Sequence, residues 1–321
     1  MDWFSFPMVI GGLVIGIVVG LTGMGGGALL TPMLVFFFHV PTLAAISSDV
    51  LISFVMKPFG GAVHAFRGTV NWRLVGYLCL GSVPGAFGGA WLISFFPVGE
   101  TLDAILRVCL GVALLLASGG LIARAWLGVV QGRAALGEGP AKESRPQMRI
   151  RPVATTLLGL FGGVIVGVTS VGAGSLIIVV LLLLYPTLKA SQLVGTDLVQ
   201  AIPLVGSATL GHLVFGEVDF GVSGSILIGA IPGAVVGALI SSRAPGGIIR
   251  RVLAILLMAS GLALLGVPAP GLIAAAVAAL VLGNIAWIVL RTQYHRRADA
   301  KLAAREATEE MTSARSRRPD A

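Results

Sequence analysis

A long apolar stretch at residues 7–38 is interrupted in its middle by the glycine-rich sequence LTGMGGGALLTP at residues 21–32. An apolar run of roughly 20 residues is long enough to cross a bilayer as a helix. Glycine is a poor helix former, so three consecutive glycines within such a run predict a break in the helix. Broken backbone at membrane depth is tolerated only where protein buries it or water reaches it. The stretch therefore predicts two half-helices whose tips meet inside the protein.

Composition places the whole chain among all-α polytopic membrane proteins. Hydrophobic residues make up 56% of the 321 residues and charged residues 11%, whereas roughly 25% of a soluble domain is charged. The apolar runs are continuous and not alternating, which favours helices over a β-barrel. The net charge of +8 comes mainly from two polar segments, 124–152 and 291–321, a pattern typical of the cytoplasmic side of a membrane protein. The lipid bilayer is therefore an expected partner and nucleic acid is not.

The second half of the chain repeats the first. VTSVGAGSLIIV at 168–179 echoes the opening glycine-rich sequence about 147 residues later. The offset then becomes 148, so that GSVPGAFGGA at 81–90 corresponds to GAIPGAVVGA at 229–238, and Asp49 to Asp197. Matches at so many spaced positions indicate an internal duplication.

Each half contains one glycine-broken segment followed by three apolar segments. These predicted segments are 7–38, 42–66, 73–96 and 102–124 in the first half, and 153–185, 189–214, 220–241 and 248–266 in the second, with an unpaired helix at 270–291. The predicted organisation is a first membrane repeat (1–124), a basic cytoplasmic linker (125–152), a second repeat (153–266), an extra transmembrane helix (267–292) and a charged cytoplasmic tail (293–321).

The charges also predict an orientation. Placing both the linker and the tail in the cytoplasm requires each glycine-broken segment to enter and leave the membrane from the same face. The segments 7–38 and 153–185 are then re-entrant hairpins, Asp2 lies outside, and the two halves are inverted relative to each other. Inverted repeats with broken helices are a recurrent transporter architecture. A full crossing at both segments is the alternative.

The two predicted tips are suited to binding an anion. The second half-helix of each hairpin begins near Gly26 or Gly174 and directs free backbone N–H groups at the tip, where anions bind well. Hydroxyl groups beside the tips could donate to an oxyanion or bond back to their own helices. The candidate substrate-binding residues at the tips are Thr22, Gly23, Gly25, Gly26, Gly27, Thr169, Ser170, Gly172, Gly174 and Ser175.

Regularly spaced glycines elsewhere favour a simpler interpretation. Small residues four apart in membrane helices commonly mark close helix packing. This interpretation is preferred for Gly12, Gly16 and Gly20, for Gly81, Gly85 and Gly89, and for their partners in the second half.

Polar residues at predicted membrane depth are further candidates, because such residues are costly there and usually functional. Asp49 and Asp197 each follow a hydroxyl residue, and the alternative role for each is a helix-start acid satisfied by backbone amides. Lys57 could supply positive charge to an anion, pair with Asp49, or extend to the membrane surface. Gln200 lies in mid-segment and could bond across helices.

Two histidines lie at corresponding positions of the repeat, and motifs of known enzymes are absent from the sequence. His64 and His212 correspond in the repeat and could relay protons for a coupled carrier, although an interfacial position is the preferred interpretation. The sequence contains no HExxH, GxSxG or Walker motif. Neither a metal, a cofactor nor an enzyme activity is therefore expected, and transport would draw on an ion gradient or on the substrate's own gradient.

Several of these motifs resemble the TauE/SafE sulfite exporter family, also called the TSUP transporters. The resemblance rests on GLTGMGGGALLTPML, AAISSDVL, HAFRGTVNW and GSVPGAFGGAWL with their second-half copies, and it covers roughly residues 7–266. The second copy departs from the glycine run by reading SVGAG, and it lacks a counterpart of Pro32.

The resemblance implies a secondary transporter in the cytoplasmic (inner) membrane. Its expected substrate is a small sulfur-containing anion, such as sulfite, thiosulfate or an organosulfonate like sulfoacetate. A passive anion channel, a carrier for a small carboxylate, and a non-transporting membrane partner of a soluble enzyme are the alternatives.

Overall fold

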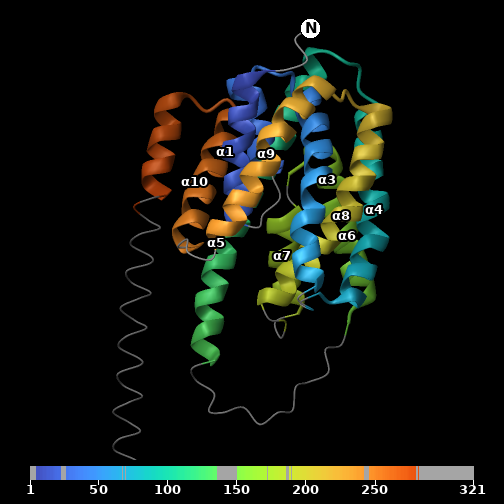
Figure 1. Ribbon diagram of the computed structural model, residues 1–321, viewed down its shortest axis with the longest axis vertical. Helices are drawn as coiled ribbons and strands as arrows, with labels where there is room; N and C mark the ends of the chain where they lie inside the picture. The colour runs from blue at the N-terminus through green and yellow to red at the C-terminus, as the bar shows by residue number, and fades with distance from the viewer. Residues whose placement is uncertain are drawn as a thin grey trace, which may run out of the picture.

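The computed structural model describes residues 5–22, 27–66, 68, 70–135, 150–171, 173–185, 188, 190–241, 246–279 and 281. Within these residues the chain is helical and contains no strand (Figure 1). The labelled helices are α1 (Phe6–Thr22), α2 (Gly27–Phe37), α3 (Thr42–Phe66), α4 (Trp72–Ile93), α5 (Glu100–Ala135), α6 (Pro152–Thr169), α7 (Ala173–Leu184), α8 (Ala190–Phe215), α9 (Phe220–Ser241) and α10 (Gly246–Leu264). A further apolar helix covers Ala269–Ala279.

Five of the described helices are long and apolar enough to cross a membrane, and several shorter apolar helices accompany them. This confirms the prediction of an all-helical, multi-pass membrane protein. α5 extends beyond its predicted end at residue 124. It continues to Ala135, into the segment that was expected to be linker. The residues from 125 to 135 include no proline and several alanines, and their two glycines, Gly128 and Gly132, are isolated from each other, so they weaken the helix without ending it.

The second glycine-rich stretch breaks its helix as predicted, and residues 23–26 of the first stretch lie outside the described residues. α1 ends at Thr22 and α2 begins at Gly27, while α6 ends at Thr169 and α7 begins at Ala173. The end of α6 is sharp because Ser170 adopts the left-handed conformation (φ 58°), from which its N–H still donates to the Val166 carbonyl oxygen at 2.7 Å.

Closely packed helix pairs form the framework around these breaks. α1 packs along α9, and α4 packs along α6, so that each pair joins one helix from each half of the chain (Figure 1). A Cβ atom on Gly16 would lie 2.3 Å from the Ala230 carbonyl oxygen, and one on Gly163 would lie 2.4 Å from that of Ser82. Such contacts are too short for any side chain, which confirms the packing interpretation of the spaced glycines.

The pairing of helices between the two halves follows the duplication. In the repeat α1 corresponds to α6 and α4 to α9, so the pair α1–α9 is the counterpart of the pair α6–α4. α3 packs against its own counterpart α8, and α5 against its counterpart α10. Figure 1 shows α1 at the end of the molecule that carries the N-terminus and α7 toward the opposite end. The orientation of each half across the membrane stays a prediction.

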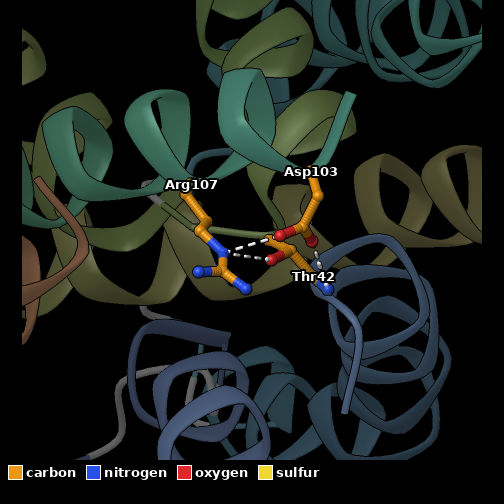
Figure 2. Close-up of polar contacts among 3 residues, drawn as sticks. All are labelled: Thr42, Asp103 and Arg107. Atoms are coloured by element: carbon orange, nitrogen blue, oxygen red, sulfur yellow. Dashed lines mark hydrogen bonds and ion pairs between the residues drawn. The ribbon is translucent and has the colours of Figure 1, made fainter. Parts of the chain in front are cut away.

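A polar cluster fixes the beginning of α3, the helix that carries Asp49 and Lys57. The Asp103 carboxylate on α5 accepts a hydrogen bond from the Thr42 backbone N–H at 3.0 Å, and pairs with Arg107 Nε at 2.7 Å (Figure 2). Arg107 Nε also donates to the Thr42 hydroxyl at 3.4 Å. An acceptor from a neighbouring helix thus satisfies one of the N–H groups that every helix start leaves open.

Candidate functional site

The end of α6 and the beginning of α2 meet directly. A Cβ atom on Gly27 would lie 2.3 Å from the Ser170 carbonyl oxygen and 3.3 Å from its hydroxyl oxygen. Only glycine allows the two chain segments to approach this closely. The structure therefore brings together the two glycine-rich regions, which lie about 147 residues apart in the sequence.

Asp49 lies beside this contact, fully buried, within a shell of hydroxyl groups. Its carboxylate accepts hydrogen bonds from Thr31 of α2 at 2.5 Å and from Ser53 of its own helix at 3.3 Å. The Ser170 side chain, at the end of α6, is a further hydrogen-bond partner. Three elements from both halves of the chain therefore converge on one carboxylate.

Lys57 lies half-buried two turns after Asp49 on α3. It is attracted electrostatically by Asp197 of α8 and, more weakly, by Asp49. The sequence had indicated Asp49 alone as a partner, and this expectation was incomplete because only the packing of α3 on α8 brings Asp197 within range. The repeat-paired aspartates thus flank a single lysine.

The hydroxyl residues that precede the two aspartates, Ser48 and Thr196, each accept a hydrogen bond from the other half of the chain. Ser48 Oγ accepts from the Asp219 N–H at 3.1 Å, and Thr196 Oγ1 accepts from the Asn71 N–H at 3.0 Å. Asn71 and Asp219 are counterparts in the repeat, and the side chain of each also caps the first turn of its helix, α4 or α9. Sequence reasoning noted these hydroxyls but not their partners.

Gln200 is fully buried one turn after Asp197 on α8. Its side-chain Nε2 donates to the Ser82 hydroxyl of α4 at 2.7 Å, as expected for a bond across helices. Its Oε1 has no hydrogen-bond partner among the residues that the structure describes. A buried amide oxygen without a donor is costly, which keeps Gln200 among the candidate substrate contacts.

The side chains of two other polar residues, Thr169 and His212, are hydrogen-bonded within the protein. The Thr169 hydroxyl donates to the Ile165 carbonyl oxygen at 2.7 Å, which is the back-bonded alternative considered from the sequence. His212 is fully buried, with Nδ1 2.9 Å from the Ser47 hydroxyl and Nε2 2.7 Å from the Gly167 carbonyl oxygen. Protein therefore encloses His212, because α8 packs against α3 and α6, and the position of His212 relative to the membrane surface stays a prediction.

Most of the remaining candidates lie wholly or partly outside the residues that the structure describes. Gly23, Gly25, Gly26 and Gly172 lie outside the described residues, as do the side chains of Thr22, His64 and Ser175. Gly174 belongs to the first turn of α7.

Comparison with known proteins agrees with this architecture. A family model described as sulfite exporter TauE/SafE matches residues 8–264. "Probable membrane transporter protein YjnA" of Bacillus subtilis (strain 168) is 34% identical over 232 residues, which cover 70% of this chain and 85% of that protein. A "probable membrane transporter protein" of Xylella fastidiosa (strain 9a5c) is 29% identical over 224 residues, which cover 68% of this chain and 77% of the relative. No solved structure shows a significant match. The chain belongs to the TauE/SafE sulfite exporter family, a family of membrane transporters.

Proposed function

We propose that this protein is a secondary transporter that moves a small sulfur-containing anion across the cytoplasmic membrane. Sulfite, thiosulfate and organosulfonates such as sulfoacetate are the substrates considered. The observation that carries the proposal is the contact between Gly27 and Ser170, which brings the two helix breaks together beside Asp49.

Helix starts and a lysine provide the attraction for an anion. α2 and α7 each begin at a break, and the first N–H groups of a helix have no partner within it. These groups, together with the positive end of each helix dipole, favour a bound oxyanion. Lys57 is the only ammonium group within α3, and it adds a full positive charge. The tetrahedral oxygens of a sulfur oxyanion can accept from several such donors at once.

The arrangement of the helices supports alternating access. α1 is bound tightly to α9, and α4 to α6, through backbone contacts at glycine. Each pair is expected to move as a unit, because the contacts leave no space for sliding. Rocking of one unit against the other would open the tips first to one face and then to the other, as in transporters built from inverted repeats.

The test is transport by the purified full-length protein in lipid vesicles. Uptake of sulfite, thiosulfate, sulfoacetate and taurine is compared with uptake of acetate under the same gradient. Saturable uptake of at least one sulfur anion, in preference to acetate, supports the proposal. Uptake of acetate alone would indicate a carboxylate carrier, and single-channel currents would indicate a passive channel.

A further inference from the structure

The buried charges at the candidate site do not balance. Asp49 and Asp197 flank Lys57, so the three side chains in their ionised forms carry two negative charges and one positive charge. An arriving anion would add negative charge beside two buried carboxylates. Like charges in buried surroundings repel strongly. A positive charge that enters with the anion would remove this repulsion.

Asp49 has the surroundings of a group that can accept this charge. It is fully buried, and Thr31, Ser53 and Ser170 all bond to its carboxylate. A hydroxyl group can either donate or accept, so the Thr31–Asp49 bond of 2.5 Å persists with its direction reversed once the carboxyl is protonated. The geometry favours a proton.

We propose that Asp49 binds one proton whenever the site binds a monovalent anion, so that the protein transports the two together. The carboxylate takes the proton from the aqueous phase that the open tips face, and releases it to the opposite phase when the anion leaves. This inference rests on the proposed function, and it names the coupling ion and the residue that carries it.

The other titratable groups nearby are less suited to this role. Asp197 has Ile178 and Ala201 at the positions corresponding to Thr31 and Ser53, so it lacks those two hydroxyl partners. His212 holds Ser47 and the Gly167 carbonyl oxygen through its two ring nitrogens. A carbonyl oxygen only accepts, so Nε2 keeps its hydrogen, and a further proton would have to bind Nδ1 and turn the Ser47 hydroxyl hydrogen away from it.

Charged groups on the other packed elements lie at helix ends. α2, α6, α7 and α9 contain no charged residue. Asp219 lies just before α9, and Asp103 and Arg107 lie at the beginning of α5 against Thr42. Lys57 lies on the helix of Asp49 itself, two turns after it.

The experiment measures proton entry in vesicles that contain the wild-type protein and a pH-sensitive dye. Inward gradients of isethionate, a monovalent organosulfonate, and of thiosulfate are imposed in sodium-free medium and, in a parallel set, in medium that contains sodium. Neither anion titrates near neutral pH, so acidification reports transported protons. We expect acidification to accompany isethionate entry without sodium, at about one proton per anion. Entry of either anion without acidification, or uptake that occurs only with sodium, overturns the inference and leaves the proposed function standing. If neither anion enters in either medium, the proposed function fails first.

Variants assign the proton to a residue. Asp49→Asn is expected to abolish acidification per anion transported, whereas Asp103→Asn, at the beginning of α5, is expected to retain it. Loss of acidification in Asp197→Asn but not in Asp49→Asn would overturn the assignment. If Asp49→Asn does not fold, Asp49→Glu serves instead. That variant keeps a carboxyl and is expected to acidify the vesicles while shifting the pH of half-maximal uptake, and an unchanged pH profile contradicts the assignment.

Discussion

Substituting Gly27 by alanine tests whether the contact between the two tips is a binding site or only a packing contact. The new Cβ atom would lie 2.3 Å from the Ser170 carbonyl oxygen, and real Cβ contacts essentially never fall below 3.0 Å. The tips must therefore separate by at least 0.7 Å, the difference between these two distances. The neighbour is backbone and cannot rotate away, so we expect a stability loss of about 1–3 kcal/mol, as for other overpacked sites.

Separation of the tips is also expected to weaken anion binding. The Ser170 hydroxyl bonds Asp49, and the first N–H groups of α2 begin at Gly27, so a shift here moves donors away from the anion. One lost hydrogen bond to a charged group costs about 1.5–3 kcal/mol. Because 1.4 kcal/mol corresponds to a tenfold change in Kd, the affinity for the transported anion should fall roughly 10- to 100-fold.

Two matched variants separate these effects. A Cβ atom on Gly159 would also lie 2.3 Å from a carbonyl oxygen, that of Leu78, but in the middle of α6, about three turns before Ser170. Gly88 has nothing within 4 Å of its Cβ position, so alanine there should be neutral or slightly stabilising. The melting temperature in detergent and the Kd for sulfite are measured for all three. If the loss of affinity relative to the loss of stability is the same for Gly27→Ala and Gly159→Ala, the tips do not form the site.

Three further predictions follow from other contacts. Lys57→Met should lower transport at least tenfold while folded protein remains in the membrane, because the aspartates then lack their cation, and unchanged kinetics would reduce Lys57 to a structural role. Single cysteines at Asp2 and Arg145 should be labelled from outside and inside respectively; labelling of both from the cytoplasm would replace the re-entrant hairpin with a full crossing. Thr196→Val should destabilise the fold by about 1–3 kcal/mol because the Asn71 N–H loses its buried acceptor, and an unchanged melting temperature would contradict this.

Much of the fold could be predicted because membrane helices are specified locally. The segments at 42–66 and 220–241 coincide with α3 and α9, since an apolar run bounded by polar or turn residues has only one way to satisfy its backbone in lipid. The helix breaks were predictable for a similar reason, because the glycine-rich sequences at residues 23–27 and 170–174 disfavour a continuous helix. The end of α5 was not predictable from the sequence, because no residue near 124 stops a helix.

The partners of each polar residue depended on tertiary structure. The duplication indicated that Asp49 and Asp197 correspond, yet it could not show that both attract Lys57 or that Asp49 has a shell of hydroxyl groups. Nor could it show that His212 is buried. The contacts of Lys57 with Asp197, of Asp49 with Ser170 and of His212 with Ser47 join residues more than a hundred positions apart. No local pattern encodes which faces of two helices meet there.

The sequence by itself determined which residues are helical, where the helices break and which positions correspond in the two halves. These are properties of single segments, set by hydropathy, glycine content and repetition. Only the tertiary structure decided that α1 packs on α9 and α6 on α4, and that this exchange brings Gly27 against Ser170 beside a buried carboxylate. The physical reason is that close contact between helices depends on backbone carbonyls meeting glycines, and the position of those carbonyls is fixed only when the whole bundle has assembled.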